Sequence, residues 1–365
     1  MSYYYLILVW VTVVYFISST VKVQKTEYVC GRKVRRYSYI WAVIIFLPLV
    51  IWSGYRGRIF DTGAYINAFS AMPSKFSDIA SYMEDVTKDK GFYYLSAVLK
   101  TCIGDNVKLY LIIIAVIQCI CLISVYRKYS INYVVTFFLF IASTDYISWM
   151  FNGMRQFCAV TIAFACFPLI LKKKYVPAAI IVALASLIHG SALLVIPFMF
   201  IVQGRPWNKK TLLFIAGIIV CIAFVERFTN ILDGMLAETQ YKNVVSDWTA
   251  SSDNGTSILR VCVYSIPTLL SLAGSKIIRK ENDPVINLCV NMSIVSMGFY
   301  VISMFTSGIF IGRLPIYFSL YNYILLPWEI EHMFDRRSRQ FVYLMMLCGY
   351  LFFYYYQIKL GWGLV

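Results

Sequence analysis

Apolar runs separated by short polar linkers recur along the whole chain. They predict twelve helical segments, near residues 3–20, 39–54, 108–126, 131–149, 155–171, 175–188, 190–203, 211–227, 257–278, 284–305, 314–330 and 340–356. A run such as "LYLIIIAVIQCICLISVY" (109–126) is apolar on every face, whereas strands of a membrane barrel alternate in polarity over roughly 10 residues. The pattern therefore predicts an all-α polytopic membrane protein with about 12 transmembrane helices.

The segments 175–188 and 190–203 are shorter than the ~20 residues that a membrane helix usually needs. Basic stretches flank the pair, "LKKKY" before it and "GRPWNKK" after it, so we expect both flanks on one side. The pair is then a short hairpin with "IHGSA" at its tip. Two longer linkers, 55–107 and 228–256, are expected outside the cytoplasm, and 78–86 and 91–102 within the first are amphipathic enough to form helices. No soluble domain interrupts residues 1–365, which we interpret as one membrane domain.

Charge orients this topology. The chain has 33 basic and 18 acidic residues and a net charge of +15. On the predicted map, 20 of the basic but only 6 of the acidic residues fall in cytoplasmic linkers. Basic residues favour the cytoplasmic side of a membrane, so this excess indicates orientation rather than nucleic-acid binding. Both termini are then expected outside.

Four arginines depart from this rule, because they map to the outward ends of helices, where cationic side chains are uncommon. They are Arg56 and Arg58 in "SGYRGRIFDTGAY", Arg155 in "FNGMRQ" and Arg313 in "TSGIFIGRLP". His189, in the predicted hairpin tip, is expected at the same depth. Arginine presents a planar fork of donors that suits phosphate, so these groups could form one outer site for a lipid-linked phosphate or diphosphate.

Arg155 has the most polar surroundings of the four. A helix is predicted to begin near Gly153, which would place Asn152 as its N-cap and add free amides and the positive helix end to Arg155. Gln156 follows directly. The alternative is that outward arginines extend to lipid headgroups or pair with acids such as Asp61 and Asp145.

Asp61 and His189 are candidates for proton chemistry. Asp61 follows Arg58 by three residues, and a carboxylate there could orient or deprotonate a sugar hydroxyl. His189 has a pKa range suited to proton transfer, although a histidine in an apolar segment is more often structural. Tyr65 offers an aromatic face to a sugar ring, although most tyrosines of a membrane protein lie in interfacial belts.

At these residues the chain resembles the EpsG-type family of bacterial polysaccharide polymerases, related in role to the Wzy-like polymerases of O-antigen, capsule or exopolysaccharide. The matching stretches are "YRGRIFDTGAYINAF" (55–69), "FNGMRQFCAVTIAFA" (151–165) and "ASLIHGSALLVIPF" (185–198). The chain departs from the family in "GRIFD" and in "KDKGF", where a Glu commonly precedes "GF". These departures leave the partner of Arg56 and any role of Glu84 or Asp89 unassigned.

The resemblance implies a GT-C-like glycosyltransferase in the bacterial cytoplasmic membrane, with its active site on the outer face. It would join undecaprenyl-diphosphate-linked oligosaccharides, donor and acceptor alike, within the membrane lipids and beside flippase and chain-length regulator proteins. The implied catalytic residues are Asp61, Arg155 and His189; those implied to bind substrate are Arg56, Arg58, Tyr65, Asn152, Gln156 and Arg313. Arginines can supply the charge that a metal ion supplies elsewhere, so we expect no metal and no cofactor.

Two other functions use similar residues. A glycan ligase would need the same diphosphate site and differ only in its acceptor. A flippase or transporter of lipid-linked sugars would need charges along a path across the membrane, and the predicted map has almost none at mid-depth.

Overall fold

The computed structural model describes residues 3–21, 24–236, 255–308 and 310–364, and the chain forms two compact units. Unit 1 consists of Met1–Leu193 and Phe334–Val365, and unit 2 of Leu194–Met333. The predicted single membrane domain stays a prediction.

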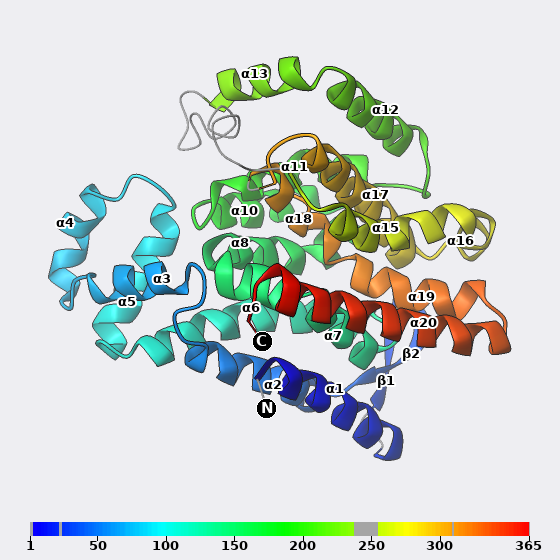
Figure 1. Cartoon of the computed structure of the whole chain (residues 1–365), viewed down its shortest axis with the longest axis horizontal. Coiled ribbons are helices and arrows are strands. Elements are labelled where there is room, and N and C mark those ends of the chain that lie inside the picture. The colour runs from blue at the N-terminus through cyan, green and yellow to red at the C-terminus, as the bar shows by residue number, and fades with distance from the viewer. Residues whose placement is uncertain (1–2, 22–23, 237–254, 309, 365) are drawn as a thin grey trace. The chain divides into compact units, whose positions relative to one another are not determined.

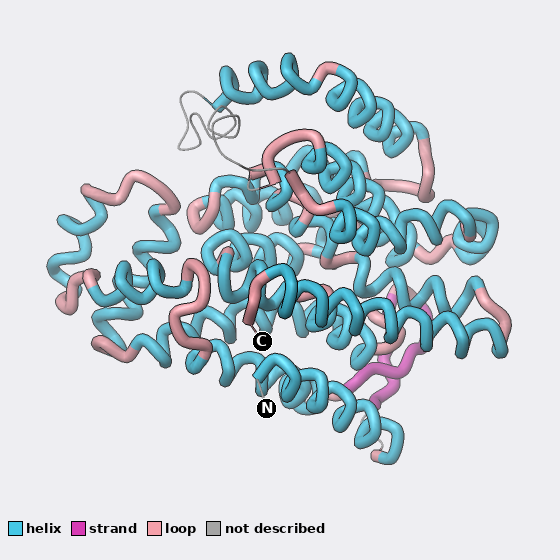
Figure 2. Tube along the Cα trace, viewed as in Figure 1, coloured by secondary structure: helices cyan, strands magenta, loops and turns pink. Residues whose placement is uncertain are grey.

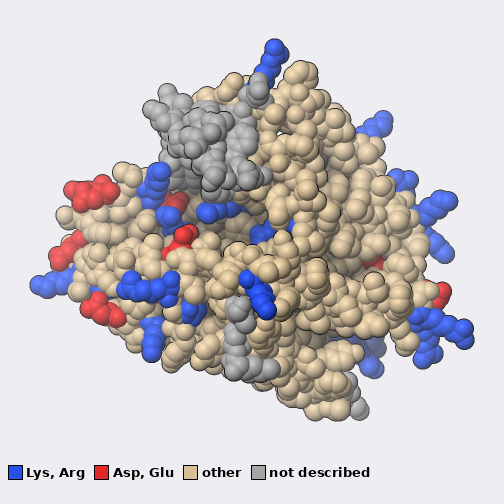
Figure 3. Space-filling model, in the orientation of Figure 1, with Lys and Arg blue, Asp and Glu red and all other residues tan. Residues whose placement is uncertain are grey.

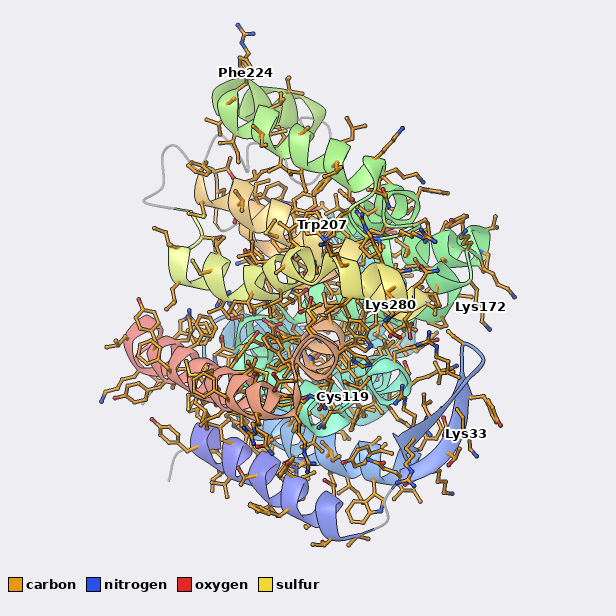
Figure 4. The ribbon with its side chains drawn as sticks, turned by 90° about the vertical axis from the view of Figure 1, so that its right-hand side faces the viewer. Lys33, Cys119, Lys172, Trp207, Phe224 and Lys280 are labelled. Atoms are coloured by element: carbon orange, nitrogen blue, oxygen red, sulfur yellow. The ribbon has the colours of Figure 1, made fainter. Side chains whose placement is uncertain are left out.

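Seven apolar helices build the body of unit 1. They are α1 (Tyr3–Thr20), α2 (Tyr39–Tyr55), α6 (Val107–Tyr129), α7 (Tyr133–Ala142), α8 (Met154–Ala165), α10 (Tyr175–Ser186) and α20 (Arg336–Tyr355), with α9 (Phe167–Leu171) continuing α8. Figure 1 shows α2 beside α6 and α6 beside α8. Cys119 lies buried among these helices (Figure 4). The last helix closes the unit, because the Tyr354 hydroxyl donates to the Tyr4 carbonyl at 2.7 Å.

Short helices gather at one end of unit 1, at the left of Figure 1. They are α3 (Thr62–Ser70), η1 (Phe76–Asp78), α4 (Ile79–Glu84) and α5 (Lys90–Ile103). Phe69 of α3 stacks on Tyr110 of α6 with ring centroids 4.1 Å apart, so these helices share a core with the apolar body. The two helices predicted within 55–107 are confirmed, and α3 is an addition.

A two-stranded hairpin stands at the opposite end of unit 1 (Figure 2). Strands β1 (Gln24–Val29) and β2 (Arg32–Tyr37) pair antiparallel around Cys30 and Gly31, which both have positive φ, as two-residue hairpin turns require. The sequence analysis left this stretch as a linker between the segments 3–20 and 39–54. Lys33, labelled in Figure 4, belongs to this hairpin. Apart from it, the described residues are helical or irregular, which agrees with an all-α fold.

Unit 2 is built around α17 (Pro284–Met304), most of which is buried. The other elements are α11 (Val195–Ile201), α12 (Lys209–Ala223), α13 (Val225–Leu236), α15 (Ile258–Ala273), α16 (Ser275–Glu281), η4 (Ile311–Arg313), α18 (Ile316–Ser319) and α19 (Asn322–Met333). Most of the second predicted outward linker, residues 237–254, lies outside the described residues. Its start belongs to α13.

By length and composition, the described residues contain fewer candidate membrane spans than the sequence predicts. Among the described residues, four helices are long and apolar enough to cross a membrane, and two bent pairs raise this to six. The predicted segment 131–149 bends by 77° between α7 and η2 (Tyr146–Asn152), and 257–278 bends by 71° between α15 and α16. Positive φ at Thr144 contributes to the first break. Helices α1, α2 and α10 are apolar but shorter, so about 12 spans are not confirmed.

The pair predicted as a hairpin does consist of two helical pieces. Helix α10 ends at Ser186, and helical structure resumes in η3 (Gly190–Leu194). Because α11 belongs to unit 2, the hairpin shape itself stays a prediction.

Candidate functional site

Arg155 lies at the start of α8, where the sequence predicted a helix to begin. Its Nη1 lies 3.0 Å from the Asp89 carboxylate and donates to the Tyr93 hydroxyl at 3.4 Å. The guanidinium carbon also lies 5.9 Å from the centre of the Tyr65 ring. The Arg155 side chain keeps 31% of its surface exposed. It is therefore held on one side and accessible on another.

Asp89 is the residue of this site to which the sequence analysis assigned no role. Its side chain is only 7% exposed, and it precedes α5 with φ of 52°. A carboxylate between Lys88 and Lys90 has the pattern of a solvated charge run, and nothing local links it to Arg155, 66 positions later. The available signal was its place two residues ahead of "GF", near where the family commonly has Glu.

Gly91 connects the start of α5 to the chain around His189. Its amide donates to the Leu187 carbonyl at 2.7 Å. A Cβ at position 91 would lie 2.7 Å from that oxygen, so only glycine fits without movement. His189, two residues beyond Leu187, is half-buried with Nδ1 2.7 Å from the Ser191 hydroxyl. The segments of Asp89 and His189 are thus packed together.

Tyr65, in α3, lies next to Arg155. Burial raises the pKa of its hydroxyl, and the neighbouring Arg155 lowers it in part. Tyr65 is therefore neutral at physiological pH and can donate one hydrogen bond.

Arg56 is buried at the end of α2 and has a different environment. Its Nε donates to the Thr62 hydroxyl at 3.1 Å, Nη1 to the Ser53 carbonyl at 3.1 Å and Nη2 to the Phe151 carbonyl at 3.5 Å. Burial lowers the pKa of Arg56 to about 10, so the side chain is still charged at neutral pH. These bonds join the end of α2, the start of α3 and η2. A contact with substrate stays a prediction for Arg56.

Asn152 meets Asp61 rather than α8. Its Oδ1 accepts from the Asp61 amide at 3.1 Å, across 91 positions. The predicted N-cap role of Asn152 is wrong: Gly153 occupies that position, and no side chain caps the helix. The first amides of α8 therefore receive no cap from a side chain, while Asp61 is exposed and its backbone is bonded to Asn152, next to this helix start.

The remaining predicted residues differ in placement. Arg58 is exposed, and its Nη1 donates to the Asn67 side chain at 3.0 Å. Gln156 is buried on α8. Arg313 is half-buried in η4 of unit 2, so its predicted convergence with the arginines of unit 1 stays a prediction. Figure 3 shows acidic side chains gathered with basic ones over the α3–α5 end. Within the described ranges, no group of three His, Cys, Asp or Glu side chains is arranged to hold a metal.

The model of the EpsG family matches residues 39–361, which include every predicted site residue. Comparisons with curated proteins and with solved structures each found no match. The match covers most of the chain and all the segments that meet around Arg155, and on this ground the chain belongs to the EpsG family.

Proposed function

We propose that the protein is a membrane glycosyltransferase that polymerises undecaprenyl-diphosphate-linked oligosaccharide repeat units on the outer face of the bacterial cytoplasmic membrane. Membership of the EpsG family supports a polysaccharide polymerase, and the apolar helices support a membrane protein. The observation that carries the chemical part of the proposal is the partly exposed Arg155, held by Asp89 and Tyr93 at the start of α8.

The reaction needs a stabilised leaving group. The acceptor's sugar hydroxyl attacks the anomeric carbon of the donor, a new glycosidic C–O bond forms, and the C–O bond to the lipid diphosphate breaks. Negative charge develops on the departing diphosphate. Arg155 and the uncapped first amides of α8 would stabilise this charge, because both present donors with positive potential.

The acceptor hydroxyl must also lose its proton. Asp61 offers an exposed carboxylate beside the start of α8, and His189 offers an imidazole in the segment packed against α5. In this proposal one of them accepts the proton. Tyr65 contributes a neutral hydroxyl and a ring face to the sugar.

Arg56 acts as a positioning residue in this mechanism. Its three donors hold Thr62, Ser53 and Phe151, and so fix Asp61 against the start of α8. Removing Arg56 would take a hydrogen bond from each of these groups, although the Thr62 hydroxyl would still donate to the Phe151 carbonyl at 3.4 Å. The net cost is about 0.5–1.5 kcal/mol for each bond lost, and more where a buried acceptor is left without a partner.

The proposal is tested by supplying purified lipid-linked repeat units to membranes that contain the protein or its variants. Arg155→Ala should lower the rate about 100-fold or more, the scale of losing one oxyanion donor. Arg155→Lys should remain well below the wild type, because an ammonium lacks the planar fork. Lys172→Ala is the control, since it removes an exposed cation at the end of α9 (Figure 4).

Deletion of the gene separates the alternatives. Loss of a polymerase leaves single lipid-linked repeat units on the outer face. Loss of a ligase leaves full-length lipid-linked chains, and loss of a flippase leaves single units on the cytoplasmic face. Normal polymer from both Arg155→Ala and His189→Ala in cells that insert these variants would refute the proposed centre.

A further inference from the structure

Figure 1 shows α1 and α2, the first two helices of unit 1, next to each other. Side chains of these two helices line an apolar groove. Its volume is about 530 Å³. Aliphatic and aromatic side chains line it: Tyr3, Leu6, Ile7, Trp10, Ile44, Leu47, Pro48, Ile51, Trp52 and Tyr55. We propose that this α1–α2 groove holds the first isoprene units of the polyprenyl chain of the lipid-linked donor. The inference rests on the proposed function.

The length of the groove suits one leaflet. On α2 its lining runs from Ile44 to Tyr55, and at ~1.5 Å per residue this spans roughly 16 Å. The hydrocarbon core of a bilayer is about 30 Å thick, so the groove reaches from one membrane surface to about its middle. A polyprenyl chain anchored by a headgroup in the outer leaflet occupies the same depth.

The groove ends where the candidate site begins. Tyr55, at its rim, directly precedes Arg56. Trp52 lines the groove, and its ring centroid lies 5.3 Å from that of Phe151. The Phe151 ring in turn lies 4.6 Å from the guanidinium carbon of Arg56. One layer of side chains therefore separates the apolar groove from the segments that hold the start of α8.

This continuity identifies the donor as the occupant. In the donor, the diphosphate is attached both to the polyprenyl chain and to the reacting anomeric carbon, so the chain must enter the membrane beside the site. In the acceptor, the reacting hydroxyl lies at the far end of the oligosaccharide, and its lipid can lie elsewhere.

Contacts among aromatic side chains hold one wall of the groove. Tyr4 packs edge-on against Trp52 with centroids 5.0 Å apart, and Tyr3 stacks on the same ring at 6.0 Å. Trp10 is fixed by the bond from its indole nitrogen to the Ile45 carbonyl at 3.0 Å. A chain that leaves lipid for the groove gains little hydrophobic energy, so the groove acts by placing the chain through van der Waals contacts.

Photo-crosslinking tests the occupant. A diazirine amino acid at Leu47 reports on the groove, and one at Val116 is the control. Val116 is a partly exposed residue of α6 and does not line the groove. The two positions are matched in their distance from the linker 55–107: Leu47 lies eight residues before the end of α2, and Val116 lies nine residues after the start of α6. In membranes supplied with lipid-linked repeat units, mass spectrometry should find a polyprenyl adduct at Leu47 and only phospholipid at Val116. Phospholipid alone at both positions would overturn the inference.

A second variant gives a kinetic measure. Leu47→Trp fills the groove and should raise KM for the lipid-linked donor about tenfold, the loss expected for some ten carbon–carbon contacts, while Val116→Trp leaves KM unchanged. Equal KM values for both variants would contradict the inference.

The two proposals fail in different ways. If Leu47 captures only phospholipid but polymer still forms and depends on Arg155, the groove is wrong and the proposed function stands. If no polymer depends on the protein, the proposed function fails.

Discussion

Gly91→Ala tests whether the contact between α5 and the His189 segment assembles the site. The added Cβ would lie 2.7 Å from the Leu187 carbonyl oxygen and 2.8 Å from its carbon, whereas ordinary contacts begin at 3.4 Å. The two segments must therefore separate by roughly 0.7 Å, which also stretches the 2.7 Å hydrogen bond between them beyond its normal range. Overpacking of this kind costs about 1–3 kcal/mol. Helix propensity favours Ala by up to about 1 kcal/mol, so only part of the cost is offset.

The expected result is a rate at least about tenfold lower, since a misplacement of about 1 Å in a catalytic group can cost a hundredfold. Gly63→Ala is the matched control. Gly63 lies in α3 beside Asp61, and its added Cβ would meet only the Arg58 Cβ at 3.8 Å, an ordinary contact. Polymer formation from lipid-linked repeat units measures the rate, and thermal unfolding in detergent measures stability. Wild-type turnover in Gly91→Ala would refute the reasoning, because the contact would then not position the site.

Three further predictions concern single carboxylates. Asp89→Asn should lower kcat at least about tenfold without loss of insertion, because the 3.0 Å ion pair that fixes Arg155 is removed; an unchanged kcat would leave Asp89 no part in the reaction. Asp335 caps α20, and hydrogen bonds from the Ser338 and Arg337 amides hold the pKa of its carboxyl below the usual 3.8. The ionised carboxylate therefore stabilises the folded state above pH 3.8, and this stabilisation is lost as pH falls through the lowered pKa. Asp335→Ala should therefore lower the melting temperature more at pH 7 than at strongly acidic pH, because the carboxylate accepts more strongly than the neutral acid. Asp335→Asn, which is neutral at both, should keep a cap of similar strength at each pH. Glu329 is fully buried in α19, and neither carboxylate oxygen has a hydrogen-bond partner in the described structure. Because an unpaired buried acid is costly, Glu329→Gln should leave the melting temperature unchanged or raise it. A large drop in the melting temperature would reveal a charged partner.

Hydropathy alone predicted most of the helices of this fold. The run 109–126 became α6, and the run 284–305 became α17, within a few residues at each end. Runs that are apolar on every face allow little besides a helix in a membrane, because every backbone polar group must be bonded within the segment. Breaks inside such runs are harder to predict. The residue type of Thr144 does not call for a positive φ, so the bend beside it was not predictable from the sequence.

The sequence identified residues of the candidate site by their type, but it did not predict which of them contact each other. Arg155 stood out because it was predicted at the outward end of a helix. The structure confirms the helix start, at Met154, while the side that it faces stays a prediction. Its partner Asp89 did not stand out, because α5, α6, α7 and η2 lie between the two residues in the chain and only the tertiary fold brings them together. Asn152 was placed beside the correct helix but given the wrong acceptor role, since the amide that it binds belongs to Asp61.

Arg56 and Arg155 differ in where their guanidinium groups donate hydrogen bonds. Every guanidinium nitrogen of Arg56 donates within the protein, and the side chain is buried, so its charge holds the scaffold. Arg155 donates to Asp89 and Tyr93 through Nη1 and keeps nearly a third of its surface open. Stabilisation of a developing charge is greatest when the donor is already oriented before the reaction begins. A cation oriented by its neighbours on one side and open on the other meets that condition, which is why the proposed mechanism pairs Arg155, rather than Arg56, with the diphosphate.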